Sequence, residues 1–247
     1  MTQYTDYKRQ KMENLLVTVC TNRKTVPSWQ RIKAQDLPLG PQEYLAKLWC
    51  DWLRDADDKM PAKDLYAGRG FSEALATAHH VGADLWVISA GLGLVHGAED
   101  VPAYDLTLSI RSDSSIQNKI MGGPFNAGQW WSDLGRRRRP KRSLANLVKS
   151  KPAARIVVSL PGSYLELIHD DLLSLPFSDL NRVRIVGPLD TSAVHERLRP
   201  CVMPYDDRFN GPETPLAGTR ADFSQRAARH FLEHMCVDTS SNDVNED

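Results

Sequence analysis

The stretch that decides the fold is Asp84-Leu-Trp-Val-Ile-Ser-Ala-Gly-Leu-Gly-Leu-Val-His-Gly-Ala-Glu-Asp-Val-Pro-Ala-Tyr-Asp-Leu-Thr-Leu108. Its apolar run at residues 85–88, bounded by turn-forming residues, predicts a strand buried on both faces. Small residues follow at once, namely Ser89, Ala90, Gly91 and Gly93. Open α/β sheets bind ligands at the carboxyl ends of parallel strands, and small residues leave room there. The stretch therefore predicts a pocket at the end of this strand.

The loop after this strand carries acidic and aromatic side chains, namely Glu99, Asp100, Tyr104 and Asp105. A long polar loop beside a bare strand end favours a functional site, because loops of this length often carry function. The alternative is structural. In that case the glycines let a helix or a neighbouring strand approach closely, and Tyr104 and Asp105 cap a turn after Pro102.

The composition of the whole chain limits its class. Of 247 residues 41% are hydrophobic, enough for a sizeable core, and 31 basic side chains balance 31 acidic ones, so net charge indicates no partner. Cys20, Cys50, Cys201 and Cys236 lie far apart with no Cys-x-x-Cys spacing. This argues against a zinc site or a disulfide framework. Because no run could span a membrane and the N-terminus lacks a secretory signal, we expect a soluble cytoplasmic protein.

Other apolar runs predict the neighbouring elements. Strands are expected at residues 15–20, 64–71, 155–159 and 183–186, and helices at 41–56, 72–80 and 164–175. This alternation predicts an α/β fold, a three-layer sandwich with a mostly parallel central sheet. We expect one domain over residues 1–236 and a disordered acidic tail over 237–247.

Polar residues follow two of the predicted strands. Thr21 and Asn22 come after the first, and Ser159 and Ser163 bracket the end of a later one. If these strands are adjacent, the four residues line the same pocket, and Asn22 presents a polar side chain to the ligand. The alternative is that Thr21 and Asn22 only start a turn, as these residue types often do.

A basic run stands out in this neutral chain. It consists of Arg136, Arg137, Arg138, Arg139, Lys141 and Arg142, and four residues separate it from the upstream pair Trp130 and Trp131. Such a cluster favours phosphate binding, and tryptophans can add base stacking, so the run predicts DNA binding. The alternative is a solvated face or the end of a helix.

Three blocks of sequence carry a family resemblance: Leu65-Tyr-Ala-Gly-Arg-Gly-Phe71, Trp86-Val-Ile-Ser-Ala-Gly-Leu-Gly-Leu-Val95 and Pro102-Ala-Tyr-Asp105. With Val157-Val-Ser-Leu-Pro-Gly-Ser-Tyr164 they make residues 15–164 resemble the peroxide-stress-protein-like families of unknown-function domains, of the DUF6884 type. Those families look like relatives of the uracil-DNA glycosylase fold. The chain lacks the Gly-Gln-Asp-Pro-Tyr and His-Pro-Ser-Pro blocks of ordinary uracil-DNA glycosylases, which argues against uracil as the substrate.

The resemblance implies an activity on DNA. The first hypothesis is a DNA glycosylase that excises a bulky modified base, such as glucosylated hydroxymethylcytosine, from phage DNA as antiviral defence. Asp105 would stabilise the sugar cation or orient water, and Asn22 would hold water or the base edge. Tyr104 would contact the flipped base, with Ser89 and Gly91 letting it approach the backbone. At the positions that match the two missing glycosylase blocks, after the first strand and after the later one, this chain has Thr21, Ser159 and Ser163, which the resemblance assigns to substrate binding.

Two other hypotheses keep DNA as the partner, whether single- or double-stranded. One is a hydrolase or nitrile hydratase acting on a 7-deazaguanine base in DNA, with Cys20 as the candidate thiol near the pocket. The other is a DNA-binding module without catalysis. We expect no metal, no organic cofactor and no membrane partner, and the oligomeric state is left open.

Overall fold

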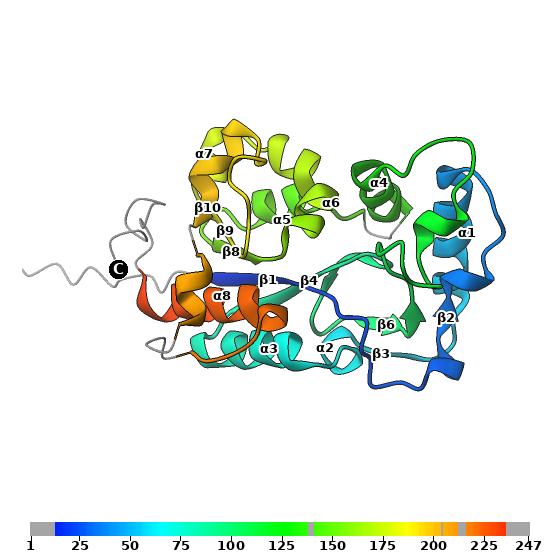
Figure 1. Ribbon diagram of the computed structural model, residues 1–247, viewed down its shortest axis with the longest axis horizontal. Helices are drawn as coiled ribbons and strands as arrows, with labels where there is room; N and C mark the ends of the chain where they lie inside the picture. Colours follow the sequence, from blue (N-terminus) through cyan, green and yellow to red (C-terminus); the bar gives the residue numbers. More distant parts are fainter. Residues whose placement is uncertain (1–12, 138–140, 204, 212–215, 236–247) are drawn as a thin grey trace, which may run out of the picture.

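The computed structural model describes residues 13–137, 141–203, 205–211 and 216–235, so the predicted tail at 237–247 lies outside the described residues. Its centre is a six-stranded sheet in the order β10-β9-β8-β1-β4-β5 (Figure 1). The strands are β1 Asn14–Val19, β4 Asp84–Ser89, β5 Gly93–His96, β8 Arg155–Ser159, β9 Val183–Val186 and β10 Val202–Met203. Neighbouring strands are parallel except for β5, which runs antiparallel to β4. The predicted α/β fold with a mostly parallel sheet is confirmed.

The most buried strand, β1, lies between β4 and β8. Its Val17 is level with Trp86 of β4 and with Val158 of β8. Its residues 15–19 are all buried, because helices cover both faces of the sheet. This explains why the strand reads as a continuous apolar run rather than as an alternating one.

Helices form the two outer layers of the sandwich. They are α1 Gln42–Asp55, α2 Ala62–Leu65, α3 Arg69–Val81, α4 Ala127–Arg137, α5 Leu144–Ser150, α6 Gly162–Leu173, α7 Phe177–Leu180 and α8 Phe223–His234. The helices α3 and α8 pack together on one side of the sheet, and α5 and α6 lie on the other side (Figure 1). The helix α4 packs against both α1 and α6. The three-layer arrangement predicted from the sequence is therefore present.

One predicted element is wrong. Residues 64–71 were expected to form a strand and a glycine turn, but the chain finishes the short helix α2 at Leu65 and begins α3 at Arg69. Gly68 separates the two helices with a φ of +108°, a conformation that glycine adopts without strain. Ser72, the expected N-cap, lies inside α3, where its backbone N–H donates to Gly68 O at 2.9 Å.

Two small sheets hold the long loop after β5 in place. The strand β2 (Ile32–Lys33) pairs in parallel with β7 (Tyr104–Asp105), and β3 (Lys59–Pro61) pairs antiparallel with β6 (Asp100–Pro102). Backbone hydrogen bonds thus fix the position of the loop that carries Tyr104 and Asp105.

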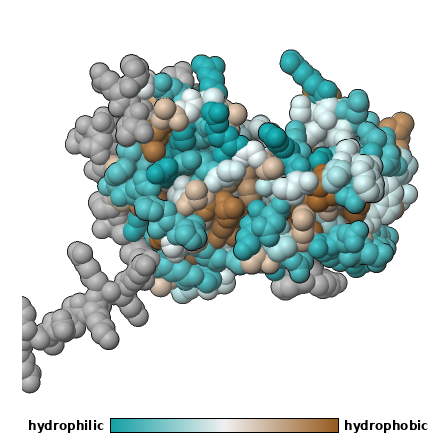
Figure 2. All heavy atoms as spheres, turned by 90° about the horizontal axis from the view of Figure 1, so that it is seen from below, coloured by the Kyte–Doolittle hydropathy of each residue, from teal (hydrophilic) through white to brown (hydrophobic). Residues whose placement is uncertain are grey.

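The surface is mainly hydrophilic on the face seen from below, with apolar residues gathered near its middle (Figure 2). Large exposed apolar side chains such as Trp29, Ile110 and Phe177 come from separate parts of the chain. Scattered exposure of this kind is normal in a folded domain. Within the described residues, no helix is both long enough and apolar enough to cross a membrane.

Candidate functional site

The carboxyl ends of β1 and β8 form the switch point of the sheet. The connection from β1 to β4 passes through α3, whereas the connection from β8 to β9 passes through α6 on the opposite side of the sheet (Figure 1). Two adjacent parallel strands whose connections leave toward opposite faces open a crevice between them, where α/β proteins bind ligands. The residues that follow β1 and β8 therefore define the candidate site.

A thiol and a phenol meet across this crevice. Cys20 directly follows β1, and its Sγ lies 3.2 Å from Oη of Tyr164, which belongs to the first turn of α6. The backbone N–H of Cys20 donates to Ile88 O at 2.9 Å, which fixes the thiol at the strand end. Burial raises the pKa of Tyr164 well above its usual value, and the neighbouring Cys20 adds to this effect. Tyr164 is therefore a protonated phenol at neutral pH and can donate a proton.

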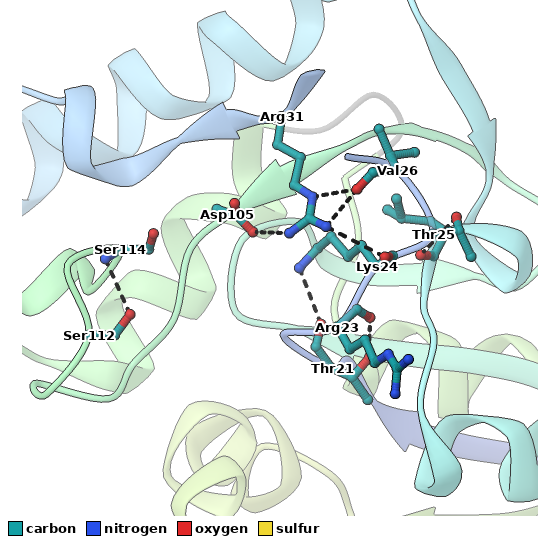
Figure 3. A network of polar contacts seen from close by, with 10 residues as sticks. Thr21, Arg23, Lys24, Thr25, Val26, Arg31, Asp105, Ser112 and Ser114 are labelled. Atoms are coloured by element: carbon teal, nitrogen blue, oxygen red, sulfur yellow. Dashed lines mark hydrogen bonds and ion pairs between the residues drawn. The ribbon is translucent and has the colours of Figure 1, made fainter. Parts of the chain in front are cut away.

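A buried lysine lies in the same cluster. Lys24 is only 8% exposed, and its Nζ donates to Thr21 O at 3.2 Å (Figure 3). The same nitrogen lies 4.4 Å from the centre of the Tyr104 ring. Burial lowers the pKa of Lys24, while nearby Cys20 and Asp105 oppose that shift. The ammonium group thus places a positive charge close to the thiol in a poorly hydrated environment.

Lys24 should make folding stability depend on pH in a distinctive way. Because burial lowers its pKa below the ordinary 10.5, the folded chain releases this proton at a lower pH than the unfolded chain does. The wild type should therefore gain stability as pH rises from the lowered pKa toward 10.5, and gain no more above it. In Lys24→Met this gain should disappear. Urea unfolding of both proteins from about pH 8 to about pH 11 would measure the free energy of unfolding of each. The tyrosine titrations that both proteins share cancel when the value for Lys24→Met is subtracted from that for the wild type.

An ion pair closes the site on the side of β7. Arg31 Nη1 lies 2.9 Å from Oδ1 of Asp105, and the same guanidinium donates to Val26 O and Lys24 O (Figure 3). Both side chains of the pair are mostly buried. Arg31 therefore fixes the Asp105 carboxylate and also braces the loop that carries Lys24.

The end of β4 is not bare, contrary to the expectation from its small residues. The Tyr104 ring is fully buried against Gly91, and its Oη hydrogen bonds with Ser89 Oγ at 2.6 Å and with Tyr66 Oη at 3.1 Å. Trp49 Nε1 donates to Gly91 O at 2.7 Å. The small residues thus have a structural role, although what approaches them is an aromatic ring and not the helix or strand of the structural alternative. On the side of Tyr104, Gly91 leaves no space for a base.

The four polar residues predicted to line the pocket after two strands, Thr21, Asn22, Ser159 and Ser163, do not converge on one point. Thr21 Oγ1 bonds with Arg23 O at 2.8 Å and Ala67 O at 2.7 Å, and Asn22 is exposed, so this segment forms the turn that was the alternative interpretation. Ser163 is exposed in the first turn of α6. Ser159 is fully buried at the end of β8, and its Oγ has no hydrogen-bond partner in the described part of the chain.

A cleft of about 750 Å³ opens beside the loop after β8. It lies between α6, the beginning of α4 and the loop after β9, and Gly162, two residues before Tyr164, lines it together with Leu165 and Leu189. The polar lining includes Glu166 and His169. Its volume suits a ligand of nucleobase or nucleoside size. Across the described ranges, no group of three or more His, Cys, Asp or Glu side chains could hold a metal ion.

The basic run does not face this site as a whole. Arg136 pairs with the buried Asp133, Arg137 lies 3.8 Å from Glu43 of α1, and Arg142 pairs with Glu99. Lys141 is exposed, and Arg138 and Arg139 lie outside the described residues. The described arginines of the basic run therefore pair with α1, with α4 and with the turn before β6, and not with the loops after β1 and β8.

Sequence reasoning missed three contributors to the site: Lys24, Tyr66 and Tyr164. Lys24 stands in a polar segment, and no local pattern indicates that its side chain is buried. Tyr164 offered a usable signal, because it follows Pro161 and Gly162 directly after a predicted strand. An aromatic hydroxyl in the first turn after a parallel strand lies close to the sheet edge where ligands bind.

Residues 53–120 match DUF6884, a family of unknown function. The matched segment includes three of the blocks on which the resemblance was based, but not the block at residues 157–164. It contains Tyr66, Ser89, Tyr104 and Asp105, and it leaves out Cys20, Lys24 and Tyr164. No curated protein and no solved structure matches the chain.

Proposed function

We propose that this protein is a nitrile hydratase in which the Cys20 thiol attacks the nitrile carbon of the substrate. The observation that carries the proposal is the 3.2 Å contact between Cys20 Sγ and Tyr164 Oη at the switch point of the sheet. A nucleophile, a proton donor and a buried cation, Lys24, are thereby gathered where α/β folds bind their ligands.

A nitrile is the electrophile that this arrangement suits. The sulfur of Cys20 forms a bond to the nitrile carbon as one π bond of the C≡N group breaks. Tyr164 passes its phenolic proton to the nitrogen and takes up the proton of the thiol, so the phenol is regenerated. Water then adds to the carbon of the thioimidate, the C–S bond breaks, and the products are the amide and the free thiol. Lys24 stabilises the negative charge that develops on sulfur.

The substrate proposed is a nitrile-bearing 7-deazaguanine base in DNA. This substrate class comes from the family resemblance, and the neighbouring cleft of about 750 Å³ has the size for such a base. A base would have to leave the helix to reach a thiol that is only 8% exposed, at a cost that stacking and phosphate contacts offset. DNA is therefore the proposed partner.

The glycosylase remains a second candidate, and one observation favours it. Arg31 holds Asp105 as a mostly buried carboxylate, which is the group that would stabilise an oxocarbenium-like transition state. Two observations argue against it. The buried Tyr104 ring occupies the place where the base was expected to bind. Asn22 is exposed, and no hydrogen bond among the described residues joins it to Asp105. The geometry therefore supports the thiol chemistry better.

Nucleoside mass spectrometry of modified DNA before and after treatment tests the proposal. DNA carrying a nitrile-substituted deazaguanine should gain the mass of one water per modified base. Glucosylated hydroxymethylcytosine DNA should stay intact. Loss of that base with formation of abasic sites would support the glycosylase instead, and DNA that is bound but unchanged would support a binding module without catalysis.

Replacing Tyr164 by phenylalanine should slow nitrile hydration by a factor of about 100 to 10,000, the usual contribution of a positioned proton donor. The variant keeps the ring and loses only the hydroxyl that contacts Cys20. Single-turnover rates of nitrile hydration, compared with the rate of Cys20 alkylation in the same variant, would show whether the proton transfer is lost while the thiol stays accessible. Tyr44→Phe on the surface of α1 is the matched control and should react like the wild type.

A further inference from the structure

The described part of the basic run contributes to a second concave region, between α1 and the end of α4. Two clefts of about 350 Å³ and about 430 Å³ adjoin there, and both are lined by Cys50, Arg54 and Arg137. The first also reaches Gly91, whose other side packs against Tyr104. Aromatic side chains thus separate this region from the Cys20 cluster.

The smaller cleft combines an apolar interior with a basic rim. Its apolar lining consists of Leu53, Leu92, Val101, Pro102 and Leu134. Three cationic side chains, those of Arg54, Lys59 and Arg137, stand around it, against one carboxylate, that of Asp100. An apolar floor with a surplus of positive charge fits an organic anion that has a flat apolar body.

Arg137 is the side chain with donors to spare. Its Nε is buried and finds no hydrogen-bond partner among the described residues. Its Nη2 lies 3.8 Å from Oε1 of Glu43, too far for a hydrogen bond, and the Glu43 side chain is 79% exposed. Arg136 and Arg54 differ, since each bonds directly to a carboxylate, of Asp133 and of Asp51. The part of the Arg137 side chain that remains exposed therefore offers terminal nitrogens that no carboxylate holds by a hydrogen bond, and a guanidinium of this kind at the junction of two clefts is suited to receive an anion.

We propose that this region, the α1–α4 cleft, binds a phosphate ester of a nucleoside. The guanidinium of Arg137 binds the phosphate, with Arg54 and Lys59 on the same rim. The base or sugar lies on the apolar lining beside Leu92. A volume of about 350 Å³ is at the lower end for small-molecule sites and suits one nucleotide unit. The same chemistry can come from a free nucleotide or from a unit of a nucleic acid strand. The proposal does not depend on the chemistry of Cys20.

Titration calorimetry with inorganic phosphate and with AMP tests the site in the full chain. AMP should bind more tightly than phosphate, and Arg137→Gln should weaken AMP binding at least about tenfold, the loss expected for one charge-assisted hydrogen bond. Arg184→Gln, which removes a guanidinium from β9 on the other half of the sheet, is the matched control and should leave AMP binding unchanged. Equal AMP binding by wild type and Arg137→Gln would overturn the proposal.

A measurement on the wild type guards against a variant that does not fold. Cys50 is half-buried and lines both clefts, so bound AMP should slow its alkylation, read by peptide mass spectrometry, while the buried Cys201 serves as the reference. Failure of AMP to protect Cys50 would contradict the proposal. Displacement of AMP by a short oligonucleotide would identify a nucleic acid strand as the source of the phosphate, and lack of displacement a free nucleotide.

Discussion

Replacing Cys20 by serine should reduce nitrile hydration by at least about a thousandfold, which is a conservative figure for loss of an essential nucleophile. A hydroxyl is nearly the size of a thiol, so the variant should fold and keep the contact with Tyr164. It is a much weaker nucleophile, because it ionises far less readily than a thiol. Single-turnover hydration of nitrile-bearing deazaguanine DNA, followed by nucleoside mass spectrometry, gives the rate directly.

Two further variants make this result specific. Cys201→Ser changes another buried thiol, one that donates to Leu180 O and lies beyond β9, and it should keep full activity. Asp105→Asn keeps a hydrogen-bond acceptor for Arg31, so it should slow the thiol chemistry far less than Cys20→Ser does, but it should abolish base excision if the protein is a glycosylase. Excision that survives in Cys20→Ser and vanishes in Asp105→Asn would contradict the proposed nitrile hydratase and support the second candidate.

The sequence predicted the fold wherever one pattern dominated. The strands β1, β4, β8 and β9 and the helix α1 lie where apolar runs and helical spacing place them; the ends of β8 and β9 agree with the prediction, and those of β1, β4 and α1 differ from it by one residue. The failure at residues 64–71 has a local cause. A single glycine, Gly68 at a φ of +108°, allows one helix to end and the next to begin within a few residues, and spacing alone does not distinguish that from a strand with a turn.

The candidate site was only partly predictable. Ser89, Tyr104 and Cys20 do gather at the carboxyl edge of the sheet, as the position of each after a strand suggests. The direction of the Tyr104 ring depends on β2 pairing with β7, a contact between residues far apart in the chain. The burial of Lys24 depends on Tyr104 in turn. Local sequence patterns contain no information about such long-range packing, so the filled strand end and the buried cation became visible only in three dimensions.

Gly91→Ala should destabilise the protein strongly. A Cβ at this position would lie 2.4 Å from Cε2 of Tyr104, well inside van der Waals contact. The ring has no room to retreat, since it is fully buried and its hydroxyl bonds with Ser89 and Tyr66. Overpacking of this kind costs about 3 kcal/mol, which corresponds to a fall in melting temperature of about 6 to 12 °C for a chain of this size. Thermal unfolding followed by circular dichroism measures the change.

Gly123→Ala is the matched control, because nothing lies within 4 Å of the added methyl group, and it should melt close to the wild type. The comparison also bears on the site, since a displaced Tyr104 ring would no longer lie 4.4 Å from the Lys24 ammonium. Gly91→Ala should therefore slow the Cys20 reaction even at temperatures where the variant is folded. If it melted like the control, the end of β4 would have free space after all. That result would restore the base-binding pocket at Gly91 and, with it, the case for the glycosylase.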